Sequence, residues 1–232
     1  MSTISFIDVP LEKNRREKIE DGIRKALKLL AEYESLPKIE DSQKGGHSGN
    51  NLNRKLYKCF LEICPSCGID SPRFGAPNPP YYRDDDRHIR ENHRPDFYWE
   101  NVDHTIEGGA WRFVLECKRL GKGNSSWNLN KNYVEKGMKR FVSFPYEYGK
   151  GDSASGMVAY IQDMDFDDIL SEVNQHITDF PEITSCVPPP ITGWAISGIS
   201  EMVHDLERPF EKKVFTFFHY WVDLRRQFAS SR

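Results

Sequence analysis

Eight consecutive residues, WRFVLECK at 111–118, constrain the fold more than any other part of the sequence. Successive side chains of a strand point to opposite faces, so one face of this segment is uniformly apolar: Trp111, Phe113, Leu115 and Cys117. The other face ends in Glu116 and Lys118, side by side. A strand this apolar is expected to be buried, and buried charges require a charged partner or a metal ion. The pattern therefore predicts a central strand that carries a functional site.

Hydrophobic spacing predicts helices and strands that alternate along the rest of the chain. Apolar residues three and four positions apart predict helices over 8–35, 51–63, 130–142 and 163–177. Short apolar runs predict strands over 96–100, 111–118, 156–161, 193–197 and 214–222, of which the last also fits a helix. Segments rich in Gly, Ser, Asn or Pro, 37–53 and 68–94, are expected to be loops. The alternation predicts an α/β or α+β fold with one main sheet.

Asp96 opens the strand that precedes the central one. Gly108-Gly109 lies between these two strands and suits a hairpin, which would bring the Asp96 carboxylate beside Glu116. Two carboxylates and the backbone carbonyl of Cys117 form a set of hard oxygen ligands that suits Mg²⁺. The amine of Lys118 is placed to orient or deprotonate a water molecule. Such a site hydrolyses phosphodiesters by metal-assisted attack of water.

Pro95-Asp96 followed by Glu116-Cys117-Lys118 resembles the motif of the PD-(D/E)xK nuclease superfamily, which includes the restriction endonucleases. The chain holds one Pro-Asp dipeptide and two acidic-x-Lys matches; the second, Glu211/Lys213, has no Pro-Asp at hairpin distance and is interpreted as part of a charged loop. The resemblance implies a restriction endonuclease-like core with a central mixed β-sheet flanked by helices. It also implies catalytic roles for Asp96, Glu116 and Lys118, and Mg²⁺, with Mn²⁺ as a substitute, bound by Asp96, Glu116 and Cys117.

The helix expected after the acidic-x-Lys strand also fits the resemblance. Tyr133, Lys136 and Arg140 fall on one face of a regular helix together with Gly137, and are predicted to bind substrate. One departure concerns the helix before Asp96, which in many members of the superfamily carries a metal-facing Glu. This chain has Asn50 and Asn51 at the start of that helix and Glu62 near its far end. We therefore expect a two-carboxylate site, and the number of bound metal ions stays open.

The distribution of charge along the chain supports a phosphate-bearing substrate. The formal net charge of −3 excludes a protein that coats nucleic acid by bulk charge. Residues 112–150, however, hold nine Lys and Arg against three Glu, a sum of +6, and residues 151–184 hold eight acidic residues and no Lys or Arg. The basic block surrounds the predicted site, as a surface that contacts a phosphate backbone should. An ordinary solvated helix face is the alternative interpretation of this block.

Other patterns support weaker interpretations. Cys59, Cys64 and Cys67 have a spacing that suits zinc or an iron–sulfur cluster, but no fourth ligand is evident and buried free thiols are the preferred interpretation. The loop histidines His88, His93 and His104 are expected to be solvated. The N-terminus has no signal peptide, and the longest strongly apolar stretch is half the length of a membrane helix. We therefore expect a soluble, cytoplasmic protein with no membrane partner.

Together these features predict one nuclease domain over residues 1–232: an N-terminal helix and loop at 1–50, a catalytic core at 51–161 and a C-terminal part at 162–232. The predicted activity is metal-dependent endonucleolytic hydrolysis of DNA, in restriction or anti-phage defence. Its partner is DNA, and a homodimer or a targeting protein is expected because duplex cleavage needs two cuts. The alternatives are a ribonuclease, or a non-catalytic binding module in which Glu116 and Lys118 form a structural salt bridge and Asp96 caps a turn.

Overall fold

A single mixed sheet of six strands lies at the centre of the molecule, in the order β1-β2-β3-β4-β6-β5. This computed structural model describes residues 8–33, 47–77, 93–102, 110–123, 127–144, 146–180 and 198–229. The strands are β1 (Arg73–Phe74), β2 (Phe97–Val102), β3 (Ala110–Leu120), β4 (Ala154–Ile161), β5 (Ile199–Arg208) and β6 (Glu211–Asp223). β3, β4 and β6 are parallel neighbours, whereas the β1–β2, β2–β3 and β5–β6 pairs are antiparallel.

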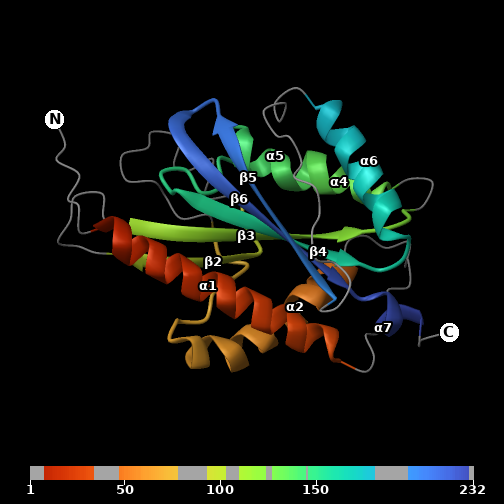
Figure 1. The fold of residues 1–232 in the computed structure, drawn as a ribbon, viewed down its shortest axis with the longest axis horizontal. Helices are drawn as coiled ribbons and strands as arrows, with labels where there is room; N and C mark the ends of the chain where they lie inside the picture. The colour runs from red at the N-terminus through yellow and green to blue at the C-terminus, as the bar shows by residue number, and fades with distance from the viewer. Residues whose placement is uncertain are drawn as a thin grey trace.

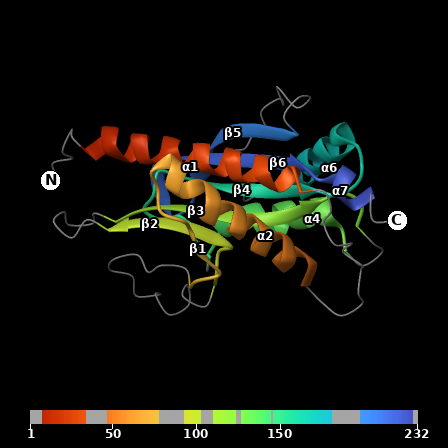
Figure 2. The same ribbon diagram turned by 90° about the horizontal axis from the view of Figure 1, so that it is seen from below.

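Helices cover both faces of the sheet, which makes the fold α+β. The helical segments are α1 (Asp8–Ala31), α2 (His47–Ile63), the short 3-10 helix η1 (Cys64–Cys67), α4 (Leu129–Tyr133), the π-helix η2 (Val134–Met138), α5 (Lys139–Val142), α6 (Phe166–Thr178) and α7 (Arg225–Ala229). α1 and α2 lie against one face, and α4, α5 and α6 lie against the other (Figures 1 and 2). Among the helices described here, none combines the length and apolar character that a bilayer span requires.

The alternation of β3 divides the core as the sequence predicts. Phe113, Leu115 and Cys117 pack under α1 and α2, in the core cluster that also contains Ile23 and Leu56. Val114 and Leu120, on the opposite side of the strand, belong to the second core cluster, under α4, α5 and α6. All five β3 side chains are at most 6 % exposed. β3 is therefore buried on both faces, and Glu116 and Lys118 project from its second face into the helical layer.

Several predicted boundaries are confirmed with small shifts, and others are wrong. The strand over 214–222 is β6, and it begins earlier, at Glu211, so the expected charged loop there is wrong. β5 was not predicted, while the strand expected over 193–197 lies outside the described residues. The predicted loop over 37–53 is wrong from His47 onward, where α2 already begins. The first residues of α2 are polar, and the first buried residues that the structure describes in this helix are Leu52 and Asn53. Hydrophobic spacing therefore gives no sign of the first turn of α2.

Candidate functional site

The predicted carboxylate Asp96 sits immediately before β2, at the end where β2 meets the last third of β3. Phe97 pairs with Leu115 in the antiparallel ladder, so Asp96 lies at the level of Glu116. The backbone N–H of Cys117 donates a hydrogen bond of 2.7 Å to Asp96 Oδ2. The β2–β3 pair therefore brings the two predicted carboxylates together, as the sequence indicates.

Asn53 of α2 holds the same carboxylate from the other side. Its Nδ2 donates a 2.7 Å hydrogen bond to Asp96 Oδ1, and its Oδ1 accepts a 3.0 Å hydrogen bond from the Tyr160 hydroxyl of β4. Asn53 is only 4 % exposed, and its amide nitrogen, which is its donor end, faces Asp96. Contacts from α2 and β3 thus fix the Asp96 carboxylate directly, and β4 fixes it through Asn53.

Glu116 is the most deeply buried charged group of the site, with 2 % of its side chain exposed. Its Oε1 accepts hydrogen bonds from Lys118 Nζ and from Arg140 Nη1, the latter at 2.7 Å. Lys118 Nζ also donates to the Cys117 carbonyl at 3.2 Å. The other carboxylate oxygen, Oε2, is buried and accepts no hydrogen bond from any residue that the structure describes. Glu116 therefore keeps one buried oxygen available for a further ligand.

The proximity of two carboxylates changes the acid–base chemistry of the site. Burial, and after it the negative charge of Glu116, raise the pKa of Asp96 to about 7 against the opposing effects of Lys118, the Cys117 N–H and Arg140. A neighbouring negative charge in a buried site disfavours ionisation of Asp96. A cation placed between Asp96 and Glu116 would favour the ionised form of Asp96, which is the electrostatic condition of a metal site.

The donor set fits Mg²⁺ but is small. Hard divalent cations prefer carboxylate and carbonyl oxygens, and Asp96, Glu116 Oε2 and the Cys117 carbonyl are of this type. Within the described ranges, no group of three or more His, Cys, Asp and Glu side chains is arranged to hold a metal ion. Glu62, the acidic residue on α2 that the sequence offered, is exposed on the helix surface. The position facing Asp96 from α2 is taken by Asn53 instead.

Of the three substrate-binding residues predicted on the following helix, the structure brings only Arg140 to Glu116. Tyr133 is completely buried, and its hydroxyl accepts a 3.1 Å hydrogen bond from Trp221 Nε1 and is hydrogen-bonded to His219 Nδ1. Lys136 is exposed, with its Nζ 4.4 Å from the centre of the Trp127 ring. The expected common face of this helix is therefore wrong for Tyr133 and Lys136.

The π-helix η2 explains why these side chains diverge. It lies between Tyr133 and Arg140, and a π turn holds an extra residue, which rotates the flanking residues by about 100° relative to a continuous α-helix. Gly137 lies within η2, where a β-carbon would come within 3.3 Å of Lys118 Cγ and clash with Met157. The absence of a side chain at Gly137 allows the helix to approach β3 and β4 closely beside Lys118.

Aromatic residues surround the guanidinium of Arg140. It lies 5.4 Å from the ring centre of Tyr146 and 5.8 Å from that of Tyr148, and its Nη1 donates a 3.5 Å hydrogen bond to the Tyr148 hydroxyl. His93 stacks on Tyr146 with ring centres 4.2 Å apart. His93 is half-buried, and burial and the charge of Arg140 lower its pKa, so it is less solvated than the sequence predicts. His88 and His104 lie outside the described residues.

Sequence reasoning missed Asn53, Tyr148 and the partly buried position of His93. For Asn53 a signal existed, because it lies three residues before Leu56 and seven before Phe60 on a helix face that is otherwise apolar. A polar residue at such a position needs a buried partner. Tyr148 lies in an irregular segment after α5, where the spacing of residues in the sequence does not predict which way a side chain points.

The cysteine group lies apart from this site. Cys59 and Cys64 are buried in the core beneath α1 and α2, and burial raises their pKa values to about 11 and about 12. Cys67 is partly exposed and donates a 3.5 Å hydrogen bond to Asp21. Cys59 and Cys64 are therefore buried free thiols, protonated at neutral pH in the structure, in line with the preferred interpretation.

Comparison with known proteins finds no match: no protein-family model, curated protein or solved structure is significantly similar to the chain.

Proposed function

We propose that the protein is a Mg²⁺-dependent endonuclease that hydrolyses phosphodiester bonds of DNA and is built on a restriction endonuclease-like core. One observation carries the proposal: Asp96 and Glu116 meet at the adjoining ends of β2 and β3, with Lys118 and Arg140 directed at Glu116. Pairing of the acidic hairpin β2–β3 with the parallel strand β4 supports the proposed core. Hydrogen bonds from Asn53 and the Cys117 N–H orient Asp96 within this arrangement.

Each residue has a distinct role in the proposed reaction. Asp96, Glu116 and the Cys117 carbonyl would hold Mg²⁺, which activates the phosphate and the attacking water. The Lys118 ammonium group lies within hydrogen-bond reach of two of these three ligands and would orient the water by donating a hydrogen bond to it. The Arg140 guanidinium would donate to a non-bridging phosphate oxygen and compensate its developing negative charge. Attack of water on phosphorus then breaks one ester bond of the strand.

A plasmid assay tests this proposal directly. We expect the purified protein to nick or cut supercoiled plasmid with Mg²⁺ or Mn²⁺ and to be inactive with EDTA. Glu116→Ala and Lys118→Ala should each remove the activity, whereas Glu62→Ala and Lys122→Ala, which change exposed residues of the same types, should retain it. Activity that survives both site variants would exclude this assignment. Circular dichroism of each variant separates loss of function from loss of the fold.

The second candidate is a non-catalytic binding module. The ion pairs of Lys118 and Arg140 with Glu116 favour it, because they would give Glu116 a purely structural role. Glu116 with Lys118 and Arg140 is also a complete structural ion-pair cluster at one of its two oxygens. Calorimetric titration with Mg²⁺ or Mn²⁺ distinguishes the two candidates. Metal binding that disappears in Asp96→Ala supports the enzyme, whereas no metal binding together with salt-sensitive DNA affinity supports the module.

The substrate polymer and the assembly are part of the proposal. The same metal site hydrolyses RNA as readily as DNA in chemical terms, so equal cleavage of matched RNA and DNA strands would change the assignment to a nuclease of both polymers. Cleavage of both duplex strands needs two sites, which a homodimer or a targeting protein would provide, and sedimentation with and without DNA measures this. The proposed setting, restriction or anti-phage defence, rests on the resemblance alone.

A further inference from the structure

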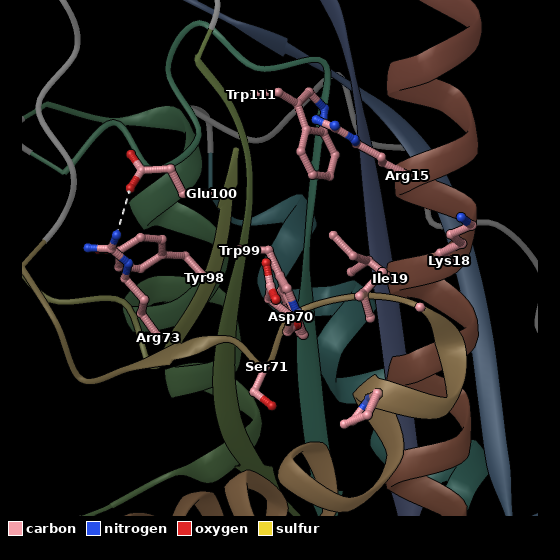
Figure 3. A pocket seen from close by; sticks show the side chains of 13 residues that line it. Arg15, Lys18, Ile19, Asp70, Ser71, Arg73, Tyr98, Trp99, Glu100 and Trp111 are labelled. Atoms are coloured by element: carbon pink, nitrogen blue, oxygen red, sulfur yellow. Dashed lines mark hydrogen bonds and ion pairs between the residues drawn. The ribbon is translucent and has the colours of Figure 1, made fainter. Parts of the chain in front are cut away.

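A cavity of about 810 Å³ lies between the N-terminal half of α1 and the edge of the sheet, farther along β2 from Asp96 (Figure 3). β1 pairs with β2 only at Arg73 and Phe74, so no described strand covers β2 beyond Tyr98. The η1 helix and the residues after it form the floor of the cavity, and Trp111 of β3 forms its upper wall in Figure 3. This volume is typical of a site for a small organic ligand.

Positive charge enters the cavity from α1. Arg15 and Lys18 are three residues apart on α1 and therefore on one side of the helix. Both line the cavity, both are exposed, and neither forms an ion pair within the part of the chain that the structure describes. In Figure 3 the Arg15 guanidinium extends from α1 toward the indole of Trp111. The two cations suit an anionic group, and the neighbouring indole suits a flat ring attached to that group.

The opposite wall has a different character. Glu100 pairs with Arg73 at 3.5 Å and with Arg112 at 3.2 Å, and the Arg73 guanidinium lies 5.7 Å from the centre of the Tyr98 ring (Figure 3). Asp70, at the floor, uses its carbonyl to accept a 2.9 Å hydrogen bond from Trp99 Nε1 and leaves its carboxylate exposed. Arg73 and Arg112 neutralise Glu100, so the exposed Asp70 carboxylate supplies the acceptors for N–H groups on this side. The charges of the cavity are therefore segregated, basic at α1 and acidic at the floor.

We propose that this cavity binds a nucleotide unit, with its phosphate on Arg15 and Lys18 and its base against Trp111. A nucleotide matches the segregated charges, because it joins an anionic phosphate to a neutral, flat base that carries N–H donors. Stacking of a base on an aromatic side chain contributes to affinity in nucleic-acid sites. A simple anion such as inorganic phosphate would use only the α1 side and bind more weakly.

The inference goes beyond the proposed nuclease function and does not require it. Tyr98, two residues from Asp96, is the nearest β2 residue that lines the cavity, and Glu100, four residues away, is the farthest, so the cavity extends along β2 from about 7 Å to about 13 Å from Asp96. This is a separate site, and the ligand is either a free nucleotide or one nucleotide of a nucleic-acid strand that also reaches the carboxylates. Both sources share the phosphate-and-base chemistry, and experiment distinguishes them.

Titration of AMP, inorganic phosphate and a six-nucleotide single-stranded DNA in EDTA tests the proposal without cleavage. Trp99 and Trp111 line the cavity, so stacking should quench tryptophan fluorescence, and calorimetry provides an independent affinity. We expect AMP to bind at least tenfold more tightly than phosphate. The double variant Arg15→Ala/Lys18→Ala should weaken AMP binding at least tenfold, and Trp111→Ala should remove the quenching.

The double variant Lys13→Ala/Lys28→Ala is a matched control, because it removes two exposed cations of α1 that do not line the cavity. It should bind AMP within twofold of the wild type. Oligonucleotide binding tenfold tighter than AMP, lost in the cavity variant, identifies a strand as the source; AMP binding without oligonucleotide binding identifies a free nucleotide. No AMP or oligonucleotide binding, or equal binding by the wild type and the cavity variant, overturns the inference. The plasmid assay on the same proteins shows separately whether the nuclease proposal holds.

Discussion

Glu20 and Glu116 are both buried glutamates with two cationic neighbours, yet their surroundings differ in one respect. Glu20 of α1 pairs with Arg16 at 3.2 Å and with Arg24 at 3.3 Å, and Arg24 continues to Glu201 of β5 at 2.7 Å. Glu116 of β3 pairs with Lys118 and with Arg140. The two clusters lie on opposite faces of the sheet, since α1 covers one face and the helix of Arg140 covers the other (Figure 1).

The difference is the order of the charges. In the Glu20 cluster a cation, Arg24, stands between the two carboxylates, so positive and negative charges alternate. In the Glu116 cluster the second carboxylate, Asp96, adjoins Glu116, and its own hydrogen bonds come from the uncharged Asn53 amide and Cys117 N–H. Alternating charges form a self-sufficient ion-pair network, whereas adjacent carboxylates lack a positive charge between them. A divalent cation would supply that charge, so we expect a structural role for the Glu20 cluster and a chemical role for the Glu116 cluster.

Exchange of each glutamate for its amide should give the largest contrast. We expect Glu116→Gln to lower the rate of Mg²⁺-dependent cleavage at least about a thousandfold, because the metal contributes several kcal/mol to stabilisation of the transition state. Glu20→Gln should leave the rate within about threefold, since it is remote from the carboxylate site. Single-turnover plasmid cleavage measures both. Equal rate losses in the two variants would mean that the clusters do not differ in function.

The pH dependence of stability should also differ between the clusters. Because the folded-state pKa of Asp96 is raised to about 7 from 3.8, the folded protein retains a proton that the unfolded chain releases. Its contribution to stability is therefore full below about pH 4 and is lost as the pH rises to about 7, by roughly 1–4 kcal/mol. Urea unfolding in EDTA at pH 5 and pH 7.5 measures this loss, and Asp96→Asn should remove most of it.

The same measurement on Glu20→Gln sharpens the contrast. Burial raises the pKa of Glu20 as well, but Arg16 and Arg24 oppose the shift. We therefore expect Glu20→Gln to change the pH dependence less than Asp96→Asn does. A larger effect at Glu20 would contradict the charge-order argument.

Loss of the support behind Asp96 should have an intermediate effect. Asn53→Ala removes the hydrogen bond to Asp96 Oδ1 and leaves the Tyr160 hydroxyl without its acceptor. We expect Mg²⁺ affinity, measured by calorimetry, to fall by about 10–100-fold, the usual effect of residues that orient metal ligands. Asn132→Ala, a change of the same type on α4, is the control and should retain wild-type affinity.

The smallest effect should come from the ion-pair network. Arg24→Ala removes the cation between Glu20 and Glu201, and we expect it to reduce the free energy of unfolding by about 1 kcal/mol, because both Arg24 and Glu201 are partly solvated. Urea unfolding at pH 7.5 measures this change, and plasmid cleavage should be unaffected. A loss of cleavage in Arg24→Ala would connect the two clusters and weaken the contrast between them.

Local patterns predicted the parts of the site that lie on regular strands. The two-residue period of β3 places Glu116 and Lys118 on one face in any sheet, and an antiparallel β2–β3 pair then brings Asp96 to Glu116. These relations follow from backbone geometry over a few residues. They hold whatever surrounds the strands.

Predictions that assumed a regular helix were wrong where the helix is irregular. Tyr133 and Lys136 leave the common face because η2 contains a π turn, and Gly137 within it packs closely against Lys118 and Met157. The partner of Asp96 was likewise missed, because Asn53 reaches it from a helix more than forty residues earlier in the chain. Such contacts depend on how α2 is placed against the sheet, and spacing within α2 does not encode that placement.

The sequence by itself determined that the chain has a buried central strand ending in a carboxylate and an amine, with a second carboxylate on the strand before it. Hydrophobic period and short-range pairing are local properties, so they can be read from consecutive residues. Only the tertiary structure decided which groups complete the site: Asn53 behind Asp96, Arg140 in front of Glu116, and a buried Glu116 oxygen with no described partner. These contacts join segments that are far apart in the sequence. In the buried interior, the pKa of a group depends on its burial and its neighbouring charges, which residue type alone does not give.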